Sequence, residues 1–292
     1  MAWEQQITGW VQQLYGLNGV FFDTLFLVFT FLAEGAFLLV AVFGVYWCVD
    51  KRRGETLLLS LFTSLMLNSI LKDVVRRPRP FLTEGYAARY VGVDNGLVDT
   101  LSLEHSYSFP SGHSQCAGSF YTALALWARR WWVWVLAAIA ILGVMTSRIY
   151  LGVHFPGDVL AGAALGVCAT LLCWWLMDRF YEHRLLLFGL VALLSLPALL
   201  LSPTADTVKT MGVGIGGVIG LWVEMRYVNF TTDLPARKKW LRLGVGGGTL
   251  LLAYLLLKAV FPHTLVFDGI RYGIIGLLAT GVLPWVFTRY KF

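Results

Sequence analysis

Long apolar stretches constrain this chain more than any other feature of its sequence. Of the 292 residues, 58% are hydrophobic and 14% are charged, whereas a soluble domain is usually about 25% charged. A soluble fold could not bury this much apolar surface and keep a wettable exterior. Several stretches approach the roughly 20 residues that an α-helix needs to cross a bilayer. The sequence therefore predicts an all-α, multi-pass transmembrane helix bundle.

The apolar stretches predict nine membrane spans. These spans lie near residues 25–49, 56–75, 113–131, 132–149, 157–177, 185–202, 207–223, 243–261 and 269–288. Residues 1–19 differ, because Trp3, Trp10 and Leu14 recur at helical spacing between glutamines. This pattern is typical of an amphipathic helix that lies in the membrane interface. Glu34, inside the first span, is interpreted as the end of an interfacial helix.

The basic residues predict the orientation in the membrane. Fourteen of the 23 lysines and arginines lie on one predicted side, in the loops that follow odd-numbered spans and in the C-terminal tail. Because cytoplasmic loops are enriched in these residues, we expect a cytoplasmic C-terminus. Segments 76–112 and 147–156 then lie on the extracytoplasmic face. The net charge is +6, and the basic residues are scattered between the spans. This distribution favours helix anchoring over nucleic-acid binding.

Three polar clusters interrupt the apolar chain, all on the predicted extracytoplasmic side. In the first, Lys72 and Arg79 lie seven residues apart, about two helical turns. Pro78 and Pro80 are expected to end the helix and to turn Arg79 inward. A planar guanidinium and a compact ammonium both suit phosphate oxygens. Taken alone, the pair is better explained as anchors that extend to the membrane interface.

The second cluster, Pro110-Ser111-Gly112-His113, is typical of a helix start. Ser111 is expected to cap the helix N-terminus, where the backbone N–H groups without helical partners bind anions. Gly112 lets a phosphate approach the backbone closely, and His113 falls in the first turn. Taken alone, these residues are better explained as an ordinary cap followed by an interfacial histidine.

The third cluster contains Arg148, His154 and Asp158. Because His154 and Asp158 are four residues apart, the carboxylate can hold one imidazole nitrogen and leave the other directed and more nucleophilic. Arg148 is then available to hold the phosphate under attack. A helix cap is the structural alternative, but ionisable groups at membrane depth are functional more often than not.

Together, the three clusters predict phosphoryl transfer. That reaction needs positive charge around the phosphate oxygens, an attacking group, and a group that handles the leaving oxygen. Two histidines can serve as the attacking group and the proton donor without a metal ion. No cofactor is therefore expected.

These clusters resemble the signature of the type 2 phosphatidic acid phosphatases, the PAP2 family, which shares a superfamily with bacterial acid phosphatases and vanadium haloperoxidases. The family motifs KxxxxxxRP, PSGH and SRxxxxxHxxxD are present here in order and with the family spacing, beginning at Lys72, Pro110 and Ser147. The resemblance implies a metal-independent phosphatase that acts through a phosphohistidine intermediate.

The resemblance also implies a role for each motif residue. His154 would be the nucleophile, Asp158 its orienting partner and His113 the general acid. The phosphate cradle would consist of Lys72, Arg79, Ser111, Gly112 and Arg148. Four residues outside the motif positions are candidates for contacts to the rest of the headgroup. Arg76 and Arg77 are either such contacts or membrane anchors, and Glu104 and His105 are better explained by a solvated loop.

The family core implies a division of the chain into three parts. An interfacial helix over residues 1–19 precedes a catalytic transmembrane core over 20–203, and about three additional transmembrane helices follow over 204–292. The glycines of segment 212–217 match GxGxxG, but they lie inside an apolar span with no preceding strand. Close helix packing explains them better than a dinucleotide site, and the glycine-rich C-terminal helices are candidates for homo-oligomer contacts.

The predicted substrate is a phosphate ester or diphosphate of a membrane lipid, because the motifs lie beside membrane spans. Two alternatives remain open. A lipid transporter or scramblase on the same fold would not need intact His113, His154 and Asp158. A haloperoxidase could place vanadate in the same cradle, but a site beside membrane spans favours a lipid.

Overall fold

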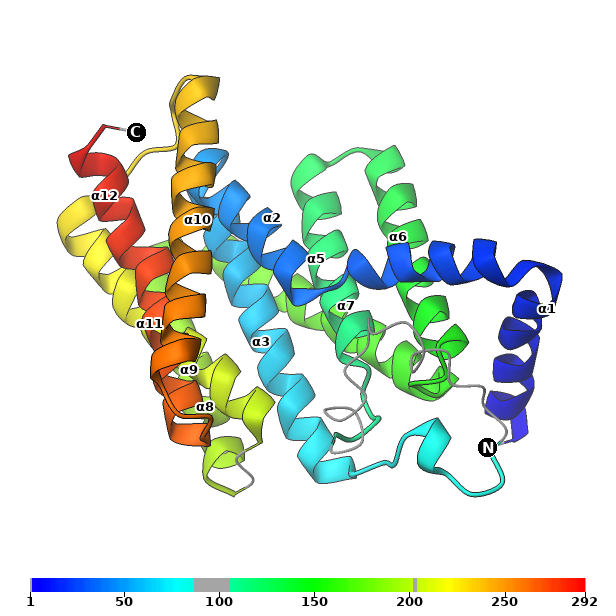
Figure 1. Cartoon of the computed structure of the whole chain (residues 1–292). Helices are drawn as coiled ribbons and strands as arrows, with labels where there is room; N and C mark the ends of the chain where they lie inside the picture. Colours follow the sequence, from blue (N-terminus) through cyan, green and yellow to red (C-terminus); the bar gives the residue numbers. More distant parts are fainter. Residues whose placement is uncertain (1, 87–105, 202–203, 292) are drawn as a thin grey trace. The chain divides into compact units, whose positions relative to one another are not determined.

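The computed structural model describes residues 2–86, 106–201 and 204–291, and every regular element in these ranges is helical (Figure 1). The long helices are α1 (Ala2–Phe31), α2 (Gly35–Cys48), α3 (Lys51–Val75), α5 (Gly112–Ala128), α6 (Trp131–Tyr150), α7 (Pro156–Arg179), α8 (Arg184–Leu201), α9 (Ala205–Val223), α10 (Ala236–Val260) and α11 (Leu265–Leu277). The short elements are η1 (Pro80–Leu82), η2 (Tyr181–His183), the π-helical η3 (Glu224–Val228) and η4 (Leu278–Val282), and α12 (Leu283–Arg289).

Seven of the described helical segments are long and apolar enough to cross a membrane. They are Ala2–Phe31, Lys51–Leu82, Trp131–Tyr150, Pro156–Arg179, Ala205–Val228, Ala236–Val260 and Leu265–Arg289. The chain is therefore a multi-pass membrane protein, as its composition predicts. Helices α5 and α8 occupy two further predicted spans, 113–131 and 185–202, but do not belong to these seven.

The segment predicted as a span over 25–49 is divided at Glu34-Gly35, where the sequence analysis places the end of a helix. Helix α1 ends at Phe31 and α2 begins at Gly35, and the amides of Ala33 and Glu34 bond back to Thr30 and Phe31 in a tight turn. The break arises because Glu34-Gly35 interrupts the apolar run with a charged residue and a residue that weakens helices.

Helix α1 is itself kinked at Asn18, whose φ of −163° and ψ of 92° are not helical. The Oδ1 atom of Asn18 accepts a hydrogen bond from the amide of Phe21 at 3.1 Å, so Asn18 caps the segment that follows it. The kink falls at the end of the predicted interfacial segment 1–19. The interfacial location of that segment stays a prediction.

The chain forms two compact units. Unit 1 comprises Met1–Leu38 and Ile70–Leu172, and unit 2 comprises Leu39–Ser69 and Cys173–Phe292. All eight residues predicted to catalyse the reaction or to hold the phosphate lie in unit 1. The family resemblance implies a different division, with boundaries at residues 19 and 203. That division stays a prediction.

Within unit 1, helices α5 and α7 pack with their backbones in close contact. A Cβ atom at Gly162 or Gly166 would overlap the carbonyl oxygen of Ser111 or Gln115 respectively. Glycine at these two positions of α7 therefore lets the start of α5 lie against the start of α7. As a result, the second and third polar clusters of the sequence come together.

Helix α1 packs against α6 on another side of unit 1. The rings of Phe26 and Tyr150 lie 4.5 Å apart between centroids, and the Tyr150 hydroxyl donates to Asp23 Oδ1 at 2.6 Å. Gln12 Nε2 donates to the carbonyl oxygen of Tyr150 at 3.1 Å. The N-terminal helix is thereby attached to the helix end that precedes His154.

Within unit 2, glycines again mediate the closest helix contact. Gly212 and Gly216 of α9 face the backbone of Gly269 and Gly273 of α11, where a Cβ atom would overlap. This contact confirms the interpretation of segment 212–217 as helix packing. Because the Gly212–Gly216 face is used within the chain, the predicted homo-oligomer would need other glycines.

Candidate active site

Arg79 is turned into unit 1 by the local sequence. Helix α3 ends at Val75, and Arg76 follows with φ of 51°, a left-handed conformation that closes the helix. Pro78 and Pro80 prevent the helix from continuing. The Arg79 side chain is only 2% exposed, which confirms the predicted inward turn.

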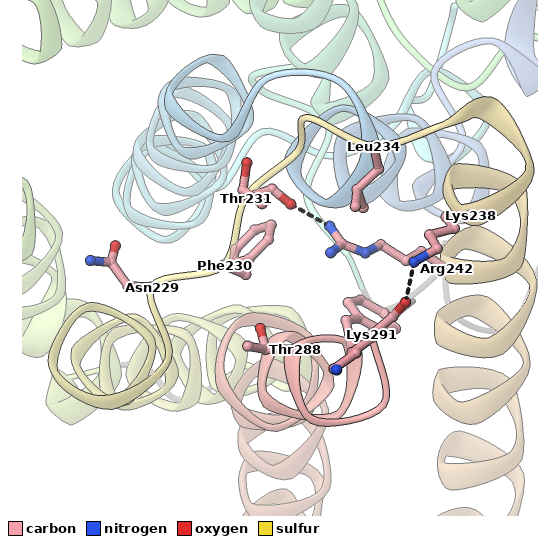
Figure 2. Close-up of a pocket in the computed structure, with 9 residues that line it drawn as sticks. Asn229, Phe230, Thr231, Leu234, Lys238, Arg242, Thr288 and Lys291 are labelled. Carbon is pink, nitrogen blue, oxygen red and sulfur yellow. Dashed lines mark hydrogen bonds between the residues drawn. The ribbon is translucent and has the colours of Figure 1, made fainter.

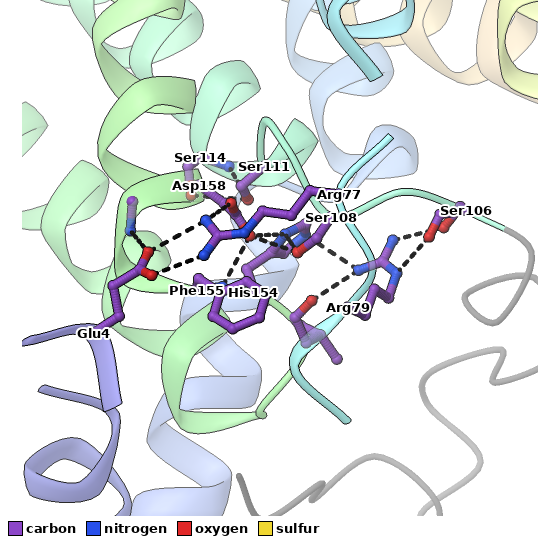
Figure 3. Close-up of polar contacts among 12 residues, drawn as sticks. Glu4, Arg77, Arg79, Ser106, Ser108, Ser111, Ser114, His154, Phe155 and Asp158 are labelled. Carbon is purple, nitrogen blue, oxygen red and sulfur yellow. Dashed lines mark hydrogen bonds and ion pairs between the residues drawn. The ribbon is translucent and has the colours of Figure 1, made fainter. Parts of the chain in front are cut away.

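Three carbonyl and hydroxyl groups hold the Arg79 guanidinium (Figure 3). Its Nε and Nη2 atoms donate to the backbone oxygen and the hydroxyl of Ser106, at 3.1 and 2.6 Å. Its Nη1 atom donates to the carbonyl oxygen of Val153 at 2.9 Å and lies 3.5 Å from Nε2 of His154. A buried cation is thus fixed beside the imidazole nitrogen that faces away from Asp158.

Ser111 caps helix α5, as its position in the second motif predicts. Its Oγ accepts from the amide of Ser114 at 3.5 Å and from the Ser114 hydroxyl at 3.1 Å. The Ser111 amide donates to the carbonyl oxygen of Asp158 at 3.1 Å. Gly112 and His113 follow in the first turn, where amide groups lack helical partners and favour anions.

His154 and Asp158 lie together at the start of helix α7. The Nδ1 atom of His154 is 3.7 Å from Oδ2 of Asp158, which is too long for a strong hydrogen bond. The Ser108 hydroxyl lies beside both, 2.5 Å from Oδ2 and 3.4 Å from Nδ1. The Phe155 amide donates to the same Oδ2 at 2.9 Å. Asp158 therefore faces Nδ1, so that Nε2 is directed at the opposite side.

Burial determines the charge state of His154. The side chain is 3% exposed and lies in the loop between α6 and α7. Desolvation lowers the pKa of His154 well below its ordinary value, although the carboxylate of Asp158 acts in the other direction. Arg79 and Arg148 lower it further. The imidazole is therefore neutral at neutral pH, which is the form that a nucleophile needs.

Ser108 was not identified from the sequence. Its side chain is completely buried, and its amide donates to the carbonyl oxygen of Arg77 at 2.8 Å. A serine two residues before Pro110 has no spacing relationship with Asp158, from which it is 50 residues distant. No sequence signal distinguishes it from other loop serines.

His113 lies opposite a carboxylate that the sequence analysis did not assign to the site. Its Nε2 atom is 3.2 Å from Oε2 of Glu34, and the two side chains are 30% and 51% exposed. The hydrogen bond with His113 lowers the pKa of the Glu34 carboxyl below its ordinary value, against a smaller effect of burial. Glu34 is therefore ionised at neutral pH. Glu34 lies in the turn after helix α1, which ends at Phe31, and contacts His113. The interfacial nature of the helix before it stays a prediction.

Arg148 lies near both predicted catalytic histidines, and its positive charge disfavours a proton on either of them. It is 3% exposed at the end of α6, and its charge acts on His113, on His154 and on Glu34. The charge of Lys72, in the last turn of α3, acts on His113. The basic residues of the predicted cradle therefore lie near the predicted catalytic histidines, Lys72 and Arg148 near His113, and Arg79 and Arg148 near His154.

Arg77 contacts carboxylates from two different helices (Figure 3). Its Nη1 donates to Asp158 Oδ1 at 2.8 Å, and its Nη2 donates to Glu4 Oε2 at 2.8 Å. Arg76, in contrast, is exposed, and its Nε donates to the carbonyl oxygen of Asp73 at 2.9 Å within its own helix end. The predicted headgroup contacts of Arg76 and Arg77 stay predictions. Glu104 and His105 lie outside the described residues.

The described ranges contain no group of three or more His, Cys, Asp or Glu side chains arranged to hold a metal ion. A cavity of about 210 Å³ lies in unit 2 (Figure 2). Its lining residues are Asn229, Phe230, Thr231, Leu234, Lys238, Arg242, Phe287, Thr288 and Lys291. The lining is basic, but it includes neither histidine nor carboxylate. The predicted nucleophile and general acid lie in unit 1 instead.

Two sequence profiles match this chain. That of the PAP2 superfamily matches residues 55–182, and that of the PAP2 superfamily phosphatase, transmembrane extension, matches residues 208–292. The first match contains all three motifs. The second covers the C-terminal helices that the sequence analysis set apart from the core.

Individual proteins are also similar. Phosphatidylglycerophosphatase B of Bacillus subtilis is 32% identical over 166 residues, which cover 52% of this chain and 72% of that protein. The undecaprenyl-diphosphatase of Sulfolobus acidocaldarius is 34% identical over 40% of this chain, and the match spans about half of that relative, 51%. The crystal structure of a transmembrane PAP2-type phosphatidylglycerolphosphate phosphatase from Bacillus subtilis is 26% identical. It aligns over 61% of this chain and 86% of that one with a TM-score of 0.46.

The profile match and the similarity to most of one curated relative agree with the three motifs and with the site that they form. This chain belongs to the PAP2 superfamily.

Proposed function

We propose that this protein hydrolyses a phosphate ester or diphosphate of a membrane lipid through a phosphohistidine intermediate at His154. One observation carries the proposal. The imidazole of His154 is buried with Nδ1 toward Asp158 and Nε2 beside the Arg79 guanidinium, so a neutral nitrogen nucleophile adjoins a cation that can hold phosphate.

In the first step, Lys72, Arg79 and Arg148 neutralise the phosphate oxygens, and the amide groups at the start of α5 bind one of them. Nε2 of His154 attacks phosphorus, and the bond from phosphorus to the leaving oxygen breaks. Protonated His113 donates its proton to that oxygen. The positive charge on the phosphorylated imidazole is stabilised by Asp158 across Nδ1.

In the second step, a water molecule attacks the phosphohistidine. His113, now neutral, takes a proton from the water, and the bond between phosphorus and Nε2 breaks. Inorganic phosphate leaves, His154 returns to its neutral form and His113 to its protonated form. Each histidine is restored and one water molecule is consumed for each phosphate released, so the net reaction is hydrolysis.

Two observations support a lipid substrate. The site lies in a chain with seven helices suited to cross a membrane, and the two curated relatives described above carry names of enzymes that act on lipid phosphates or diphosphates. By the distribution of basic residues, we place the site on the extracytoplasmic face and the C-terminus in the cytoplasm.

The test is phosphate release by the purified full-length protein from phosphatidic acid, phosphatidylglycerophosphate and a polyprenyl diphosphate, with and without EDTA. A water-soluble sugar phosphate serves as a non-lipid substrate. We expect release from at least one lipid, insensitive to EDTA, and a loss of about 10³-fold or more in His154→Ala. The matched control His263→Ala changes an exposed histidine in the loop after α10.

Several outcomes would overturn the proposal. They are no release from any lipid, preference for the soluble ester, or full activity of His154→Ala. Lipid movement between leaflets in reconstituted vesicles without any hydrolysis would favour the alternative of a transporter or scramblase.

A further inference from the structure

Arg77 is a residue of the site to which the family motifs assign no role. The motif that begins at Lys72 specifies Arg79 and Pro80 but not position 77. In the structure, its guanidinium lies between the carboxylates of Glu4, on α1, and Asp158, on α7. A chain segment far from the motifs in sequence is thereby linked, through Arg77, to the predicted partner of the nucleophile (Figure 3).

The contact fixes which oxygen Asp158 presents to His154. Its Oδ2 accepts from the Ser108 hydroxyl and the Phe155 amide and faces Nδ1 of His154. Its Oδ1 accepts from Arg77 Nη1 at 2.8 Å. With each oxygen occupied by a different donor, the carboxylate cannot rotate without breaking a charge-assisted hydrogen bond.

Arg77 is itself held on several sides. Nη1 and Nη2 donate to the two oxygens of Glu4 at 3.2 and 2.8 Å, a paired geometry that only arginine can make. The guanidinium lies 3.8 Å from the centroid of the Phe155 ring, and the Arg77 carbonyl accepts from Ser108. Its orientation is therefore determined by the same residues that surround Asp158.

Glu4 is placed for this contact by the first turns of α1. It is 5% exposed, and its Oε1 also accepts from the amide of Gly157 at 3.2 Å. One turn later, the Thr8 hydroxyl bonds to that of Tyr86 at 2.7 Å, and the Tyr86 ring packs on Phe155. A buried carboxylate is costly unless it is paired, so the Glu4–Arg77 pair makes this docking of α1 favourable.

We propose that Arg77 is a positioning residue for the Asp158–His154 pair, and that Glu4 holds Arg77, so that the N-terminal helix is a functional part of the active site. The proposal rests on the hydrolysis proposed above. It assigns to the start of α1 a role in catalysis in addition to its predicted interfacial location.

The charges around His154 determine the direction in which the acid limb of kcat/KM should move when Arg77 is replaced. Asp158 favours the imidazolium, while Arg79 and Arg148 oppose it. The positive charge of Arg77 partly neutralises Asp158 on one side and Glu4 on the other. Removing Arg77 exposes His154 to the undivided carboxylate charge, which stabilises the imidazolium and moves the acid limb of kcat/KM to higher pH.

The test compares Arg77→Gln, Arg77→Lys and Glu4→Gln in the purified full chain, on the lipid that wild type hydrolyses. We expect kcat of Arg77→Gln to fall roughly 10- to 100-fold with KM within about threefold, as for other residues that orient a catalytic ligand. The acid limb should rise by roughly 0.5 to 1 pH unit. Arg77→Lys should recover part of kcat, because an ammonium keeps the charge without the paired geometry.

Glu4→Gln separates positioning from folding. It should reduce kcat by less than Arg77→Gln, and the double variant should resemble Arg77→Gln, because Glu4 acts through Arg77. Arg130→Gln, an exposed arginine between α5 and α6, and Glu182→Gln, an exposed glutamate, are matched controls for charge and residue type.

The inference is overturned if Arg77→Gln retains wild-type kcat and pH profile, or if the effects of Glu4→Gln and Arg77→Gln simply add. An absence of hydrolysis by wild type contradicts the proposed function instead. If Arg77→Gln does not fold, Glu4→Gln decides the matter, because it removes a negative charge and leaves Arg77 to Asp158. Its kcat should fall and its acid limb should move to lower pH, and wild-type kcat with an unchanged acid limb would overturn the inference.

Discussion

Nε2 of His113 lies 3.2 Å from Oε2 of Glu34, a residue 79 positions earlier in the chain. Because Glu34 is ionised at neutral pH, it stabilises a protonated imidazole opposite it. A general acid must carry its proton when the leaving oxygen departs. The pairing therefore favours the form of His113 that the proposed first step requires, against burial and the charges of Arg148 and Lys72, which together lower the pKa of His113 to about 4.

Glu34→Gln should remove this support. We expect kcat to fall by roughly three- to tenfold, and the alkaline limb of the pH–kcat profile to move to lower pH, since the protonated imidazole becomes less stable. Steady-state kinetics between pH 5 and 9 measure both effects. Glu182→Gln is the control, and an unchanged alkaline limb would show that Glu34 does not act through His113.

The buried His154 predicts a second pH effect. Its pKa lies well below the ordinary value because burial disfavours the charged ring. The acid limb of kcat/KM for the free enzyme should therefore lie below about 6.5, the ordinary histidine value. A limb at or above that value, in a substrate whose phosphate does not titrate there, contradicts the assignment of His154 as a neutral nucleophile.

The lowered pKa of His154 also makes the stability of the fold depend on pH, in a definite direction. As the pH falls, the unfolded chain takes up a proton on His154 before the folded protein does. The contribution of this group to stability is thus present above the unfolded-state pKa, and it is lost as the pH falls through the depressed folded-state value. His154→Ala should therefore show a smaller decrease in melting temperature between pH 7 and 5 than wild type.

Local sequence patterns predicted the parts of the site that depend on short spacings. Ser111 caps α5, Arg79 turns inward after Val75, and His154 lies near Asp158, all within a few residues of the features that signal them. Helix positions followed likewise from apolar runs, except where Glu34-Gly35 divides the first span.

The remaining parts of the site depend on contacts across the chain. The Glu34–His113 and Glu4–Arg77 pairs join residues 79 and 73 positions apart, and Ser108 reaches Asp158 over 50. Such pairs form only after helix packing determines which ends meet. No period or motif encodes that choice, so a glutamate that binds a catalytic histidine looks like any interfacial glutamate.

Ser108→Ala tests whether the serine helps to orient Asp158. The variant removes the hydroxyl donor from Asp158 Oδ2 but leaves the Phe155 amide in place. We expect kcat to decrease about three- to tenfold, and stability by about 1 to 3 kcal/mol, since a buried acceptor loses one of its partners. Kinetics and thermal unfolding in detergent measure the two effects.

Ser195→Ala is the matched control for Ser108→Ala. Ser195 is also buried, but its hydroxyl donates to the Val191 carbonyl of its own helix α8. It should lose some stability at most and keep wild-type kcat. An equal loss of kcat in both serine variants would mean that Ser108 contributes through general stability alone.

Gly166→Ala tests the helix contact that brings the motifs together. A Cβ atom there would overlap the Gln115 carbonyl of α5 and approach the Ser119 amide. Because backbone atoms cannot yield as a flexible side chain does, we expect α5 and α7 to separate, with a loss of roughly 1 to 3 kcal/mol in unfolding free energy. Activity should fall as well, since Ser111 and Asp158 are joined across this contact.

Gly189→Ala on α8 gives the opposite expectation, because nothing lies within 4 Å of a Cβ atom at that position. Alanine favours helix over glycine by about 1 kcal/mol, so this variant should be as stable as wild type or slightly more. Thermal unfolding in detergent and phosphate release measure both variants. If Gly166→Ala were as stable and active as Gly189→Ala, the close α5–α7 contact would not be what holds the second and third motifs together.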